Sequence, residues 1–83
     1  MKNKIKRIHF IGIGGSGMSG IAEVMQTLGF IVSGSDLAIS DSIKSLKKLG
    51  IKVYSQHTKA NIKKVDTIVF SNAISRNNPE LIE

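Results

Sequence analysis

A glycine-rich turn contains the residues of this sequence whose types and spacing are best suited to binding a ligand. Gly12, Gly14 and Gly17 follow an apolar run at 8–11 and precede a helix-period pattern. Glycine adopts positive φ without steric penalty, and a turn without side chains lets a diphosphate accept hydrogen bonds from backbone N–H groups. The dipole of the following helix places partial positive charge behind these groups. The turn therefore predicts a ligand that carries phosphate.

An acidic residue stands where a ribose could be held. Asp36 ends the second apolar run, about 20 residues beyond the turn, as in the dinucleotide-binding fingerprint G-x-G-x-x-G. Ser16 and Ser19 add hydroxyl groups near the predicted helix N-terminus, where anions bind. This pattern predicts a nucleotide-type ligand, but it is compatible with both a dinucleotide and a nucleotide sugar.

Alternating strands and helices must position these residues. Apolar runs predict strands at 8–13, 30–35, 51–54 and 67–70, and apolar spacings of three and four predict helices after Gly17 and near Ser40. Such an order predicts an α/β fold, a Rossmann-like doubly wound parallel sheet with the strand order 3-2-1-4. The helix side chains expected in the core are Met18, Ile21, Ala22, Met25, Leu28, Ile43, Leu46 and Leu49.

Glycine, proline and polar residues mark where the helices begin and end. Gly29 and Gly50 stand where the first two helices should stop. Ser40 or Asp41 can cap the second helix, and Asn78 before Pro79 is typical of another helix start. The sequence stops shortly after that start. It therefore predicts a fragment, residues 1–83 of an N-terminal domain, cut before a fifth strand and with a sheet edge open to self-association.

Composition narrows the class of protein. The 83 residues suffice for one small domain, and the absence of cysteine excludes disulfides and thiolate metal sites. The lack of cysteine is compatible with a reducing compartment, so a cytoplasmic protein is expected. No stretch approaches the roughly 18 apolar residues of a membrane span, so the chain is expected to be soluble. The net charge is +6, but the four aromatic residues lie in or beside apolar strand-like runs and are not interleaved with the lysines. Nucleic acid is therefore not an expected partner.

Four motifs resemble those of the Mur ligases in family order. Residues 8–22 match the opening signature I-H-F-I/V-G-I-G-G-S/A-G-M-S-G-I-A throughout. The later matches are Val32-Ser33-Gly34-Ser35-Asp36, His57 with Asn61-Ile62, Ser71-Asn72-Ala73-Ile74, and Asn78-Pro79-Glu80. Two positions depart from the family pattern: Gln56 stands where glycine is frequent, and Asn72 where serine is common.

The resemblance is to the branch of the family that adds L-alanine to UDP-N-acetylmuramate in peptidoglycan synthesis. It implies an ATP-dependent ligase of three domains, of which the first holds the UDP part of the substrate. ATP and Mg²⁺ belong to the second domain, and the incoming amino acid is held with the help of the third. The sequence accordingly contains no G-x-x-x-x-G-K-S/T motif for ATP.

Residues that bind the UDP-sugar are expected in this segment, and catalytic or metal-binding residues are not. The expected binding residues are Gly14, Gly15, Ser16, Gly17, Met18, Asp36, His57, Ser71, Asn72 and Ala73. His57 is expected to contact the ligand or to fix a loop, and His9 to be structural. Two alternatives remain at this point. One is an NAD(P)-binding domain of an oxidoreductase or a ligand-sensing domain, and the other is the related ligase that recycles murein peptides.

Overall fold

The computed structural model describes residues 6–15, 17–38, 40–71, 74 and 78–82. Strands and helices alternate along most of the chain, as the sequence predicts. In order, the elements are β1 (Arg7–Ile11), α1 (Met18–Thr27), β2 (Ile31–Ser35), α2 (Asp41–Lys48), β3 (Lys52–Tyr54), the 3₁₀ helix η1 (Lys59–Ile62), β4 (Thr67–Val69) and α3 (Pro79–Ile82). The short helix η1 was not predicted, because its polar sequence carries no apolar period.

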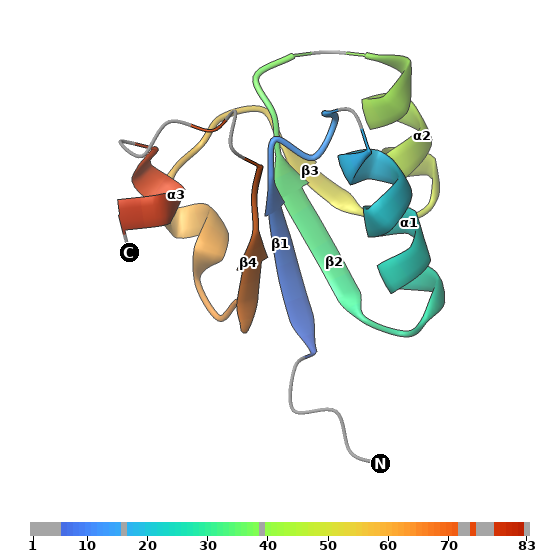
Figure 1. The fold of residues 1–83 in the computed structure, drawn as a ribbon, viewed down its shortest axis with the longest axis horizontal. Helices are drawn as coiled ribbons and strands as arrows, with labels where there is room; N and C mark the ends of the chain where they lie inside the picture. The colour runs from blue at the N-terminus through green and yellow to red at the C-terminus, as the bar shows by residue number, and fades with distance from the viewer. Residues whose placement is uncertain (1–5, 16, 39, 72–73, 75–77, 83) are drawn as a thin grey trace.

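The four strands form one parallel sheet in the order β3-β2-β1-β4 (Figure 1). This order confirms the predicted doubly wound topology. In register, Phe10 of β1 lies opposite Gly34 of β2 and Val69 of β4. The carboxyl ends of all strands meet at one edge, at the top of Figure 1, where the glycine turn, the β2–α2 connection and the β3–η1 connection also lie. We call this the carboxyl edge.

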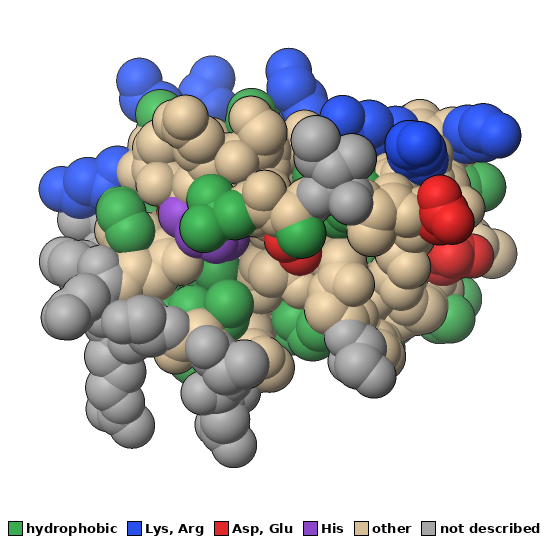
Figure 2. Space-filling model, turned by 90° about the horizontal axis from the view of Figure 1, so that it is seen from above, with side chains coloured by type: hydrophobic (Ala, Val, Ile, Leu, Met, Phe, Trp, Pro, Cys, Tyr) green, Lys and Arg blue, Asp and Glu red, His purple; other side chains and the backbone are tan. Residues whose placement is uncertain are grey.

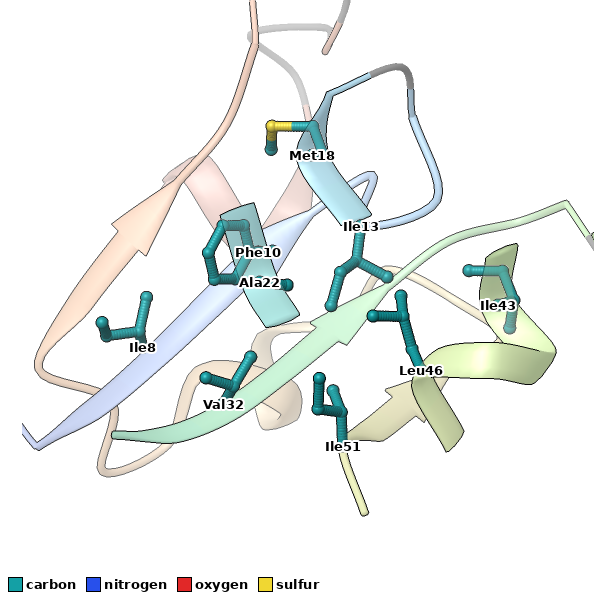
Figure 3. Close-up of a cluster of buried hydrophobic side chains, with 9 residues drawn as sticks. All are labelled: Ile8, Phe10, Ile13, Met18, Ala22, Val32, Ile43, Leu46 and Ile51. Atoms are coloured by element: carbon teal, nitrogen blue, oxygen red, sulfur yellow. The ribbon is translucent and has the colours of Figure 1, made fainter. Parts of the chain in front are cut away.

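One face of the sheet carries the apolar core under α1 and α2 (Figure 3). Its buried side chains are Ile8, Phe10, Ile13, Met18, Ala22, Val32, Ile43, Leu46 and Ile51. Alternation along β1 and β2 places Ile8, Phe10 and Val32 on this face, because successive side chains of a strand point to opposite sides.

Three residues predicted to lie in the core are exposed instead. Ile21 is 47% exposed, Leu28 64% and Leu49 50%. Helix α1 packs through Met18, Ala22 and the partly buried Met25. Because a helix turns about 100° per residue, positions 21 and 28 lie on the flank of that stripe. Leu49 falls beyond the last turn of α2, where it is the C-cap residue.

The helix boundaries follow the predicted capping residues. The Ser40 side chain accepts a hydrogen bond from the backbone N–H of Ile43 at 3.3 Å and caps α2. Gly29 and Gly50 follow α1 and α2 with φ of 102° and 89°, a region that glycine enters without strain. Asn78 caps α3 by accepting the N–H of Glu80 at 2.9 Å. Local sequence thus fixes where these helices begin and end.

Candidate nucleotide site

The glycine turn is tied to the end of β2 by backbone hydrogen bonds. The N–H groups of Gly12 and Ile13 both donate to the Ser35 carbonyl, at 2.8 and 3.1 Å. Gly12 and Gly17 have φ of 75° and 79°, as the predicted reversal requires, and Gly17 is the N-cap of α1. The first N–H groups of a helix have no intrahelical partner. The turn therefore directs the positive end of α1 to the carboxyl edge, as an anion site needs.

Close packing excludes side chains from Gly14. A Cβ at this position would lie 2.8 Å from Cδ1 of Ile43 and 3.0 Å from Oδ2 of Asp36. Real Cβ atoms essentially never approach other atoms to less than 3.0 Å. By contrast, a Cβ at Gly20, on the first turn of α1, would meet no atom within 4 Å. A side chain at position 14 would therefore displace Ile43 and Asp36, whereas one at position 20 would displace nothing.

Asp36 joins the glycine turn to the loop that follows β2. Its Oδ2 accepts the N–H of Gly14 at 2.9 Å, and its Oδ1 accepts the N–H of Ala38 at 2.9 Å. Each carboxylate oxygen has two lone pairs, so both retain capacity for a further donor such as a ribose hydroxyl. Asp36 is half-buried beside the turn, where the sequence places it. Its additional structural contact with Gly14 was not predicted.

A buried polar network lies on the face of the sheet opposite the core. His9 and Glu80 are both fully buried, and His9 Nε2 lies 3.0 Å from Glu80 Oε1. The same oxygen accepts the hydroxyl of Ser35 at 2.7 Å. The other ring nitrogen of His9 lies 2.8 Å from the Ser33 hydroxyl. His9 is thus structural, as predicted, and its position beside Ser33 follows from the register of β1 on β2.

Glu80 also holds the loop that carries His57. Its Oε2 accepts the backbone N–H of Thr58 at 3.0 Å and the side-chain amide of Asn61 at 2.5 Å. The Asn61 amide donates as well to the carbonyl of Gln56 at 2.7 Å. His57 lies between these anchored residues, and its Nδ1 is 2.7 Å from the Ser35 hydroxyl. The β3–η1 loop is therefore fixed against β2 by one carboxylate.

The network sets the charge of its members. Burial opposes ionisation of Glu80, but hydrogen bonds from Ser35, Asn61 and His9 outweigh it, so the pKa of Glu80 is below its ordinary value. Burial lowers the pKa of His9, and the attraction to Glu80 only partly offsets this effect. Glu80 is consequently an ionised acceptor and His9 a neutral imidazole near neutral pH.

Most of the predicted binding residues that the structure describes meet at the carboxyl edge. Gly14, Gly15 and Gly17 form the turn, with Asp36 and His57 on the adjoining loops. Figure 2 looks onto this edge and shows histidine, acidic and apolar side chains in its centre, with Lys and Arg along one margin.

Four predicted residues need separate comment. Met18 is 8% exposed and belongs to the core, and its backbone N–H already donates to the Gly15 carbonyl. Ser71 is exposed just beyond β4, and its carbonyl accepts the N–H of Ile74 at 3.1 Å. Ser16, Asn72 and Ala73 lie outside the described residues.

The contributions of Ser35 and Glu80 were missed from the sequence. The motif Asn78-Pro79-Glu80 was interpreted only as a helix start and a family match. A signal was present in the strands, where His9, Ser33 and Ser35 are polar residues on one face of β1 and β2, opposite the face that carries Ile8, Phe10 and Val32. Buried polar side chains need partners, so this face predicts a polar residue arriving from elsewhere in the chain.

A separate hollow of about 200 Å³ lies away from the carboxyl edge. It is lined by the first residues of three strands, Arg7, Ile31 and Lys52, and also by residues such as Tyr54 and Lys63. Because strands begin at the opposite edge of the sheet, this hollow is not part of the glycine site.

The described part of the chain lacks membrane-spanning helices and clusters of metal ligands. None of its helices is long and apolar enough to cross a membrane. Within the same residues, no three His, Asp or Glu side chains are grouped so that they could hold a metal ion.

The parallel sheet, the glycine turn and the acidic residue after β2 define a domain of the doubly wound α/β class, in which ligands bind at the carboxyl ends of the strands. The family model described as "Mur ligase family, catalytic domain" matches residues 7–83. The chain belongs to the Mur ligase family.

Similar proteins include curated ligases and solved structures. The chain is 54% identical over 82 residues to the UDP-N-acetylmuramate–L-alanine ligase of Polaromonas sp. (strain JS666 / ATCC BAA-500), and 55% identical to that of Azoarcus sp. (strain BH72). Each match covers 99% of this chain and 18% of the relative. The chain therefore spans under a fifth of the length of these relatives.

Two crystal structures share the fold. The UDP-N-acetylmuramate-alanine ligase of Thermotoga maritima superposes with a TM-score of 0.86 and 36% identity, over 92% of this chain and 18% of that one. The UDP-N-acetylmuramate:L-alanyl-gamma-D-glutamyl-meso-diaminopimelate ligase from Neisseria meningitides gives 0.81 and 36%, over 94% and 25%.

Proposed function

We propose that this chain binds the UDP part of UDP-N-acetylmuramate at the carboxyl edge of its sheet. It does so as the substrate-holding domain of an ATP-dependent ligase that joins L-alanine to this nucleotide sugar in peptidoglycan synthesis. The observation that carries the proposal is the glycine turn, anchored to Ser35 and Asp36, at the start of α1. Relatives that match 99% of the chain at 54–55% identity are named as ligases for this substrate.

The chemistry of the edge suits a nucleoside diphosphate. The N–H groups of Gly12 to Gly15 have partners within the chain. The positive end of the dipole of α1, and the N–H groups of its first turn that lack an intrahelical partner, favour a diphosphate beside the turn. The remaining lone pairs of Asp36 suit ribose hydroxyls, and His57 and Ser71 lie on loops at the same edge. We assign to these groups binding and orientation of the substrate, and no catalytic step.

ATP and Mg²⁺ do not fit the residues of this chain. The sequence lacks an ATP-loop motif, and the described residues hold no cluster of metal ligands. More than four fifths of each curated relative lies outside the matched segment. We place ATP, Mg²⁺ and L-alanine in such further parts of the enzyme, and with them the activation of the substrate carboxylate and its transfer to the amine.

Isothermal titration of the chain with UDP, UDP-N-acetylmuramate and NADH tests the proposal. We expect heat of binding with both uridine nucleotides and none with NADH. The variant Gly14→Ala should weaken UDP binding by about tenfold or more, because its Cβ would lie 3.0 Å from Asp36 Oδ2 and displace this carboxylate. One hydrogen bond lost between Asp36 and the ligand corresponds to roughly that factor. Gly20→Ala is the matched control and should bind normally, since its Cβ meets no atom. A folded chain that ignores millimolar UDP, or prefers NADH, would contradict the proposal.

A further inference from the structure

The number of protons on each group determines which group donates and which accepts in the hydrogen bonds around Glu80. An ionised carboxylate only accepts, and its two oxygens offer four lone pairs. Four donors fill them: His9 Nε2 and the Ser35 hydroxyl on Oε1, and the Thr58 and Asn61 N–H groups on Oε2. The proton of the Ser35 hydroxyl therefore points to Glu80.

This direction determines which nitrogen of His57 carries a proton. A serine hydroxyl has one proton, and that of Ser35 is used on Glu80. In its hydrogen bond with His57, the Ser35 oxygen must therefore be the acceptor. The donor is His57 Nδ1, which lies 2.7 Å away. A neutral imidazole has one N–H, and its Nε2 is therefore a bare acceptor.

The bare nitrogen of His57 is open to a ligand. The side chain of His57 is 15% exposed. Its Nε2 has no hydrogen-bond partner among the described residues. In this part of the chain, every buried side-chain nitrogen or oxygen atom has a hydrogen-bond partner, so an atom without one is not buried. Nε2 is thus accessible, on a loop that Thr58 and Asn61 hold rigidly on Glu80.

We propose that His57 is preset as a hydrogen-bond acceptor, which receives an N–H or O–H of the base or ribose of the bound nucleotide. A phosphate oxygen is also an acceptor, so the lone pair of Nε2 disfavours the diphosphate at this position. Ser35 and Glu80 act as positioning residues, because they fix the tautomer of His57 without touching the ligand. The ligand half of this inference rests on the function proposed above.

The tautomer can be measured in the free chain by two-bond ¹H–¹⁵N correlation of labelled histidine, at a pH well above the ordinary histidine value of about 6.5. We expect His57 with a protonated Nδ1 and a bare Nε2. Ser35→Ala should shift His57 towards the Nε2–H form that free imidazole side chains prefer. Ser33→Ala is the matched control. Ser33 lies on β2, like Ser35, but its hydroxyl group bonds to His9 and not to His57. A protonated Nε2 in the unmutated chain would overturn the inference.

Adding ligands then tests the acceptor role. UDP should move the His57 Nε2 resonance while this nitrogen stays unprotonated, and inorganic pyrophosphate should move only the amides of the glycine turn. An equal response of Nε2 to pyrophosphate would overturn the inference, because His57 would then face phosphate. If UDP moved no resonance at all, the proposed function and the ligand half of the inference would both fail, whereas the tautomer is decided by the free chain.

Discussion

Replacing Glu80 with glutamine removes one charge and preserves the side-chain volume. The carboxylate receives donors on both oxygens, two on each. A glutamine amide offers acceptor lone pairs only on its oxygen, and its NH₂ group must face the other two donors. If the NH₂ group faces Thr58 and Asn61, whose N–H groups can only donate, two buried hydrogen bonds are unmade. If it faces His9 and Ser35, both groups must reverse from donors to acceptors, and Ser35 no longer directs its proton away from His57.

The size of this effect follows from the burial of the site. Glu80 is fully buried, and each unsatisfied buried donor costs about 1–3 kcal/mol. Because the variant either leaves donors unpaired or replaces charge-assisted hydrogen bonds with neutral ones, we expect Glu80→Gln to lower the free energy of unfolding by about 1–3 kcal/mol. At roughly 0.05–0.15 kcal/mol per residue, a chain of this size has only about 4–12 kcal/mol in total. The substitution should thus remove a large part of the stability.

Urea denaturation at neutral pH, followed by circular dichroism, measures this loss. The matched control is Glu23→Gln, the same chemical change on the exposed surface of α1, and it should stay within about 0.5 kcal/mol of the unmodified chain. Equal midpoints for the two variants would refute the account of Glu80 as the acceptor that holds α3 and the His57 loop to the sheet.

Three further predictions concern the fold. Gly34→Ala should destabilise the chain by about 1–3 kcal/mol, since its Cβ would lie 2.5 Å from Ile13 Cδ1, whereas Gly20→Ala should be neutral or stabilising in the same urea assay. Ser40→Ala should cost about 1 kcal/mol through loss of the α2 cap, and an unchanged urea midpoint would contradict this. Because burial lowers the pKa of His9 below 6.5, the unfolded chain binds a proton at a higher pH than the folded chain. Stability should therefore be full above pH 6.5 and fall as the pH drops towards the folded pKa of His9, and equal urea midpoints at about pH 7.5 and 5.5 would contradict it.

The sheet topology was predictable because each of its determinants is local. Apolar runs define the strands, and crossover connections of this length impose parallel neighbours with a fixed hand. The caps at Ser40 and Asn78 and the glycines after α1 and α2 also act over a few residues. The glycine turn and Asp36 were found for the same reason, because both depend on positions at strand ends.

The polar network could not be predicted in this way. His9 and Glu80 are 71 residues apart in sequence, and Ser35 and Glu80 are 45 apart. Their contact depends on α3 and η1 lying on the face of the sheet opposite α1, beyond any local pattern (Figure 1). The errors at Ile21 and Leu28 have a related cause, because apolar spacing alone does not give the width of the surface that α1 covers.

The central claim is that the carboxyl edge holds a uridine nucleotide through the glycine turn. Backbone amide chemical shifts of the ¹⁵N-labelled chain during UDP titration test it most directly. We expect saturable shifts centred on Gly14, Gly15, Gly17, Asp36 and His57, which need about ten times more UDP in Gly14→Ala and the same UDP concentration in Gly20→Ala. Shifts centred instead on the hollow near Arg7 and Lys52, or no shifts in a folded chain, would contradict it.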